Sequence, residues 1–141
     1  MLRIRPEQQA VFQNLADIAF ERRVVAFMRD KCGPVKVQIP SGSFSVRDLP
    51  EQTLSQMVHT GVARARTYGM SWESSLTSFV MIMFICAPNF DAHPLVGRIL
   101  HDPETEPDKR IDKVIEAMTE ESWKTASQMY DVHTWALEQG E

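Results

Sequence analysis

Long apolar runs, cysteine and basic charge are all scarce in this 141-residue chain, and each shortage excludes a class of protein. A membrane-spanning helix needs about 20 consecutive apolar residues, whereas the longest apolar run here has nine, so we expect no membrane insertion. The two cysteines, Cys32 and Cys86, allow one disulfide at most and fit a reducing compartment. Because the N-terminal residues also lack the apolar stretch of a secretory signal, the sequence predicts a cytoplasmic protein.

Basic residues are outnumbered, since 15 Lys and Arg stand against 19 Asp and Glu and give a net charge of −4. A nucleic-acid partner requires a basic face, so we expect none. The His-x-x-x-His and Cys-x-x-Cys spacings of zinc sites do not occur. Neither the GxxxxGK[ST] phosphate loop nor the Gly-x-Ser-x-Gly elbow is present. We therefore expect no catalytic residues, no metal and no cofactor.

The strongest positive signal is the run of nine apolar residues at 79–87, which Pro88 ends. With the residues from Trp72 onward it reads as a helix that is apolar on every side, and such a helix belongs inside a folded protein. We expect an all-α, single-domain bundle over residues 1–141, with five to six helices around a buried central helix at about 72–87.

The N-terminal part predicts one long amphipathic helix from Pro6 to Cys32, because proline suits the first helical position and apolar residues recur every three to four positions. Asp48 and Ser71 are expected to cap the second and third helices, and Thr119 the last one. Between these lie two further expected helices, at about 95–100 and from about 107 to 118. The apolar positions of the first helix are Val11, Phe12, Leu15, Ile18, Ala19, Val24, Val25, Phe27 and Met28.

The segment 33–48 differs from the rest of the chain, because Val35, Val37 and Ile39 alternate with polar residues as in a strand. With Phe44 on a second strand it predicts a short hairpin. One hairpin alone is only marginally stable, so we expect this arm to lie against the helices or against another molecule. In the second case, a partner strand could add to the edge of the arm.

Two aromatic residues near the C-terminus are further candidate partner contacts. Trp135 is expected to be harder to bury than Trp123, and together with Tyr130 it could anchor a partner. The predicted partner-binding residues are therefore Val35, Val37, Ile39, Phe44, Tyr130 and Trp135.

Side chains that could carry chemistry occur without a strong pattern. Asp91 and His93 could offer two ligands from one loop, and Cys86 could be a nucleophile, although its apolar neighbours indicate packing. Neighbouring carboxylates could act as acid and base, but they read more simply as a solvated surface. These pairs are Glu104 and Glu106, Asp108 and Asp112, and Glu120 and Glu121.

Several segments, taken in order, carry a resemblance to a known family. They resemble small helical proteins encoded beside type VI secretion spike and effector genes in Gram-negative bacteria. The resemblance implies an accessory or chaperone-like partner of secretion cargo, and no functional residue is transferred from it. The matching segments are Arg66-Thr-Tyr68-Gly69, the run 79–87, Asn89-Phe90-Asp91 leading to Pro94, Ile99-Leu100-His101-Asp102-Pro103, and Arg110-Ile111-Asp112.

Three functions remain open from the sequence. The first is a non-catalytic adaptor or co-chaperone that binds a secretion effector or its chaperone through an apolar groove or through the arm. The second is an immunity protein whose acidic surface covers a basic toxin cleft. The third is a small enzyme that uses Asp91, His93 or a carboxylate pair.

Overall fold

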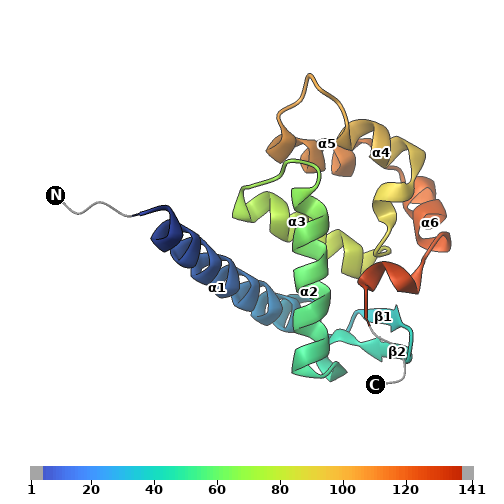
Figure 1. The fold of residues 1–141 in the computed structure, drawn as a ribbon. Helices are drawn as coiled ribbons and strands as arrows, with labels where there is room; N and C mark the ends of the chain where they lie inside the picture. Colours follow the sequence, from blue (N-terminus) through green and yellow to red (C-terminus); the bar gives the residue numbers. More distant parts are fainter. Residues whose placement is uncertain (1–4, 138–141) are drawn as a thin grey trace.

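The computed structural model describes residues 5–137, which form six α-helices, one antiparallel hairpin and short 3₁₀ turns (Figure 1). This confirms the predicted helical bundle with a short extended arm. Within the described residues, no helix is both long enough and apolar enough to cross a membrane. The elements are α1 (Pro6–Cys32), β1 (Lys36–Ile39), β2 (Gly42–Ser45), α2 (Glu51–Arg66), α3 (Glu73–Ile85), α4 (Pro94–Leu100), α5 (Arg110–Ala117) and α6 (Glu120–Gln128).

Buried apolar side chains form one cluster, which extends from Phe20 in α1 to Trp135 near the C-terminus. Within it, α2 and α3 approach each other closely at Gly61. A Cβ atom at this position would lie 3.0 Å from a Val80 methyl group and 3.2 Å from the Met83 sulfur. A side chain at position 61 would therefore make tight contacts with α3, and glycine allows the two helices to pack closely here.

The apolar run lies mainly in α3, as predicted, but it is not buried on every side. Phe79, Val80 and Phe84 are fully buried, and α3 contacts α1, α2 and β1. Ile82 is half-buried and Ile85 is 58% exposed. The expectation of an entirely buried helix is wrong for this face, because α6 covers it only in part.

Two of the three expected helix caps are wrong. Thr119 does cap α6, with its hydroxyl accepting from the Ser122 N–H at 3.1 Å. Asp48 instead lies in a 3₁₀ turn, and α2 starts after Pro50. The N–H groups of Ser71 and Trp72, just before α3, both donate to one carboxylate oxygen of Asp108 at 2.8 Å. This cap comes from a distant part of the chain and leaves no local sequence pattern.

The arm folds as the predicted hairpin, with Val37 opposite Phe44. It packs into the body, where β1 contacts α3 and the 3₁₀ turn Val132–Trp135. Val37 is 1% exposed and Ile39 is 8% exposed, so both side chains belong to the core. The arm therefore lies against the helices, which is the first of its two expected positions.

Candidate protein-binding surfaces

Tyr130 and Trp135, the two predicted aromatic anchors, make contacts within the fold. Trp135 is fully buried with its ring centroid 4.9 Å from that of Phe84, whereas Trp123 is half-buried, which reverses the expected order. The Tyr130 hydroxyl accepts from Trp135 Nε1 at 2.9 Å and from the Gln38 N–H at 2.9 Å, and it donates to the Gln38 carbonyl at 2.8 Å. Tyr130 therefore connects the C-terminal turn to the hairpin.

This contact also closes the edge of the hairpin that was expected to accept a partner strand. In the β1–β2 register Gln38 lies opposite Ser43, and its N–H and carbonyl are both taken by Tyr130. A partner strand would have to displace that hydroxyl to pair with β1. The remaining predicted contacts, Val35 and Phe44, are half-buried at the margin of the core.

Asp91, the loop carboxylate considered for catalysis, is held by hydrogen bonds within the fold. The Arg64 Nε–H donates to both oxygens of Asp91, at 2.9 and 3.0 Å, and the Tyr68 hydroxyl donates to the second oxygen. Burial, and then the hydrogen bond to Asp91, raise the pKa of Tyr68 well above its usual range. His93 accepts from the Leu95 N–H at 3.2 Å and caps α4. Asp91 and His93 thus each hold a turn in place.

The carboxylate pairs lie in different surroundings. Burial alone would raise the pKa of Asp108, but hydrogen bonds from the N–H groups of Trp72 and Ser71 outweigh it and hold that pKa below its usual range. Glu120 and Glu121 are exposed at the start of α6. Across residues 5–137, no three His, Cys, Asp or Glu side chains are placed to hold a metal ion together.

Several segments that carry the family resemblance meet at one end of the molecule. Arg110 donates to the carbonyls of Leu100 at 2.9 Å, Thr105 at 3.0 Å and Tyr68 at 3.2 Å. The Tyr68 ring lies edge-on to that of His101, with centroids 5.3 Å apart. These contacts join the end of α2 to α4 and α5, so the residues that make them stabilise the fold.

The first candidate surface is an open groove of about 980 Å³ between α3 and α6, called here the α3–α6 groove. Its apolar part includes Ile85, which is 58% exposed, and the half-buried Trp123. The thiol of Cys86 lines it as well and lies 3.7 Å from the Trp123 carbonyl. Burial raises the pKa of this thiol to about 11, so it is protonated at neutral pH. Glu120, Glu121 and Lys124 provide charged groups along the groove.

The second candidate surface lies on the projecting half of α1, which we define as residues 6–19. This half extends away from the body, and all of its residues are exposed except Asp17, which is half-buried (Figure 1). Val11, Phe12, Leu15 and Ile18 are 58%, 59%, 56% and 40% exposed. We call these four side chains the α1 stripe.

Val11 and Leu15 of the α1 stripe lie on the side of the helix opposite to two buried residues of α1. Val11 and Phe20 are nine residues apart, and so are Leu15 and Val24, which is two and a half turns of about 3.6 residues. Phe20 and Val24 are 5% and 2% exposed and face the core. Val11 and Leu15 therefore face away from Phe20 and Val24, whereas Ile18 lies two turns before the buried Val25, at the edge of the covered face.

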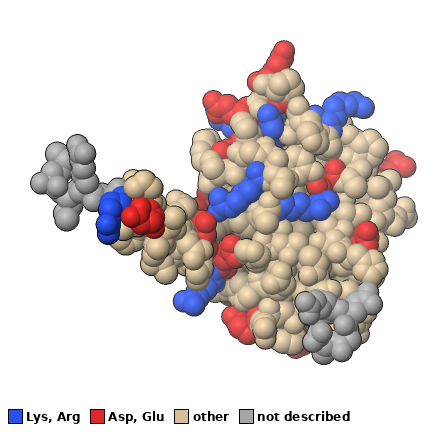
Figure 2. Space-filling view, viewed as in Figure 1, with Lys and Arg blue, Asp and Glu red and all other residues tan. Residues whose placement is uncertain are grey.

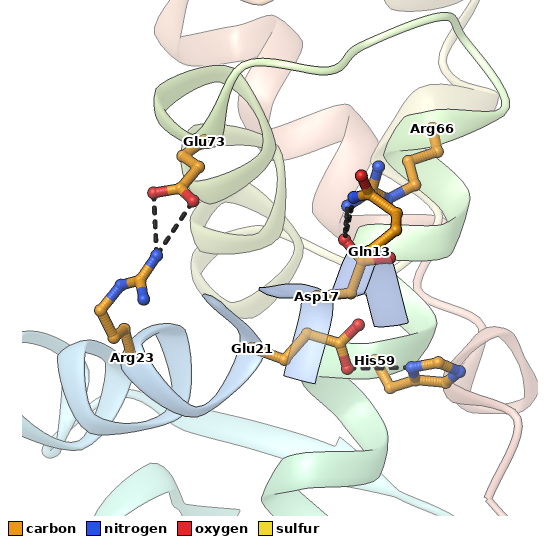
Figure 3. A network of polar contacts seen from close by, with 7 residues as sticks. All are labelled: Gln13, Asp17, Glu21, Arg23, His59, Arg66 and Glu73. Carbon is orange, nitrogen blue, oxygen red and sulfur yellow. Dashed lines mark hydrogen bonds and ion pairs between the residues drawn. The ribbon is translucent and has the colours of Figure 1, made fainter. Parts of the chain in front are cut away.

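Polar contacts fix this orientation of α1, as Figure 3 shows. Asp17 binds Arg66 of α2 at 3.2 Å, while Arg23 binds Glu73 of α3 at 2.9 Å. A further contact of 2.9 Å joins Glu21 to His59 of α2. In the space-filling view, charged groups lie near the tip of the projecting half and at its junction with the body, with uncharged surface between them (Figure 2).

Comparison of the chain with models of known protein families, with curated proteins and with solved structures gave no match.

Proposed function

We propose that the chain is a non-catalytic cytoplasmic binding protein, an adaptor or co-chaperone for a type VI secretion effector or for that effector's chaperone. The observation that carries the binding role is the α3–α6 groove, where Ile85 and Trp123 are accessible beside each other. An exposed isoleucine and a tryptophan are the kind of side chains that anchor a partner in an interface. The link to secretion comes from the resemblance of segments 66–69, 79–87 and 89–94.

The chemistry of the groove suggests what would occupy it. An apolar helix face or strand could cover Ile85 and Trp123, as in helix-in-groove recognition. Glu120 and Glu121 stand at one side, so a basic residue next to the apolar segment would gain a favourable contact. The partner segment is therefore expected to be apolar with a flanking Lys or Arg.

The test is co-purification of the chain with the products of the genes encoded beside it. Ile85→Glu places a charge in the groove and should reduce binding at least about tenfold. Replacing an anchor residue of an interface costs about 2 kcal/mol or more of binding free energy. Ile115→Glu is the matched control, because Ile115 is a 49% exposed isoleucine on α5, outside the groove. Equal binding by the two variants would contradict the proposal.

The thiol of Cys86 gives a second readout in the wild-type chain. Its alkylation by iodoacetamide should be slow at neutral pH and rise about tenfold per pH unit, because the thiolate is the nucleophile and the pKa is about 11. A partner in the groove should slow this reaction further. Cys32, which is 3% exposed, is the internal control and should stay unmodified with or without the partner.

The net charge of −4 favours a second candidate function, an immunity protein that covers a basic toxin cleft. Co-expression with the neighbouring toxin or effector gene separates the two candidates. An immunity protein restores growth, whereas an adaptor changes only the secretion of the effector.

A further inference from the structure

We propose that the chain forms a symmetric dimer in which the projecting halves of α1 from two copies pair antiparallel, with Val11, Leu15 and Ile18 of one copy against the same residues of the other. This proposal concerns a different surface from the α3–α6 groove and does not depend on it. It starts from four large apolar side chains that are 40–59% exposed on a helix segment that has almost no contact with the body.

The residue spacing on this face suits a helix partner. Glu7, Val11, Leu15, Ile18 and Arg22 follow one another at steps of four, four, three and four. Steps of three and four keep side chains on one face of a helix, as in helices that pair along a seam. The seam thus has an apolar centre, an acidic residue at one end and a basic residue at the other.

The charges at the two ends select a second copy in antiparallel orientation as the partner. When two copies pair around a centre between residues 14 and 15, Glu7 of each lies beside Arg22 of the other, and Val11 lies beside Ile18. A parallel pair would bring like charges together. Arg22 makes no ion pair with any described residue, and Glu7 contacts only the exposed Arg5 at 3.6 Å, so both are available.

The position of the body leaves room for this pairing. Glu7, Val11, Leu15, Ile18 and Arg22 are all exposed, so a second helix can reach this face over residues 7–22. The seam over residues 7–22 is short, about 24 Å long at 1.5 Å per residue. A single short helix pair buries less than the ~800 Å² per partner of a typical stable complex, so we expect a reversible dimer with a micromolar dissociation constant.

Sedimentation equilibrium of the full chain tests the dimer. Between about 1 μM and 1 mM, the wild-type mass should rise reversibly from that of the 16.1 kDa monomer towards twice that value. Leu15→Glu places two carboxylates at the centre of the seam and should weaken dimerisation at least about tenfold. Gln9→Glu adds the same charge to the same helix on the side away from Val11, Leu15 and Ile18 and should leave the dimer intact.

Charge exchange tests the antiparallel register. Glu7→Arg and Arg22→Glu should each weaken the dimer several-fold, and the double variant E7R/R22E should restore it, because each residue then again meets an opposite charge. Circular dichroism checks that every variant keeps its helices. A wild-type chain that stays monomeric to about 1 mM, a dimer unaffected by Leu15→Glu, or a double variant as weak as the single ones would overturn the proposal. Ile85→Glu, which tests the α3–α6 groove, should leave the dimer unchanged.

Discussion

The hairpin is more buried, and the projecting half of α1 more exposed, than their sequences suggest. The hairpin has the alternating pattern of a free arm, yet Val37 and Ile39 are buried and Tyr130 closes its edge. The projecting half has the periodicity of a packed helix, yet Val11 and Leu15 are more than half exposed. A hydrophobic pattern thus identifies which residues share a face, but it does not identify what covers that face.

Contacts between distant segments explain the difference. The hydroxyl of Tyr130 meets the backbone of Gln38, 92 residues earlier in the chain, and holds the hairpin on the body. Within residues 5–137, no hydrogen bond or ion pair joins the first turns of α1 to the body, and such contacts begin at Asp17. The predictions below use substitutions in and around these two regions, from the largest expected effect to the smallest.

Trp135→Ala should have the largest effect. Trp135 is fully buried against Phe84, and removing a large core side chain costs about 3–5 kcal/mol in the free energy of unfolding. Urea unfolding measured by circular dichroism gives this value. A loss below about 1 kcal/mol would mean that Trp135 is a surface anchor, as the sequence suggested.

Tyr130→Phe should come next. It keeps the ring and removes the hydroxyl, which leaves the Gln38 N–H and carbonyl and the Trp135 indole without their partner. Leaving a buried polar group unpaired costs about 1–3 kcal/mol in unfolding free energy, and this applies to the indole N–H of the fully buried Trp135. The amide of Gln38 should also exchange its hydrogen faster than in the wild type. Unchanged exchange would show that Tyr130 does not close the hairpin.

Asp108→Ala removes the distant cap of α3 and should lower the unfolding free energy by about 1 kcal/mol near neutral pH. The folded-state pKa of Asp108 is depressed, so its carboxylate stabilises the fold above the unfolded-state pKa and this contribution is lost as the pH falls. The difference between wild type and variant should therefore shrink below about pH 4. A difference that stays constant from neutral to acid pH would contradict the role of the charged carboxylate.

Leu15→Ala should have the smallest effect on the monomer, within about 0.5 kcal/mol, because the side chain is 56% exposed. Met28→Ala is the matched control in the buried half of the same helix and should cost about 2–5 kcal/mol. Both are measured by urea unfolding at protein concentrations below the dimer range. Similar losses for the two variants would mean that the projecting half packs on the body.

Much of the fold follows from the sequence. Pro6 marks the start of α1, and Thr119 caps α6. The predicted caps at Asp48 and Ser71 were wrong. Asp48 lies in a 3₁₀ turn, and the N–H groups just before α3 donate to the distant carboxylate of Asp108.

The candidate site was harder to predict. Val37, Ile39 and Trp135 are buried, although the sequence placed them in a partner interface. Their burial depends on contacts between segments far apart in the chain, which local patterns do not encode. The α1 stripe, by contrast, was within reach of sequence analysis. Apolar positions nine residues apart, such as 15 and 24, lie on opposite sides of a helix, so α1 has two apolar faces instead of one.

Hydrogen exchange of the wild-type chain, at concentrations below the dimer range, tests most directly whether the hairpin belongs to the core while the projecting half of α1 does not. The amides of Val37, Gln38 and Ile39 should exchange only in openings that approach global unfolding, whereas those of residues 10–16 should exchange through local opening, far faster. Fast exchange in the hairpin together with strong protection of residues 10–16 would contradict the account.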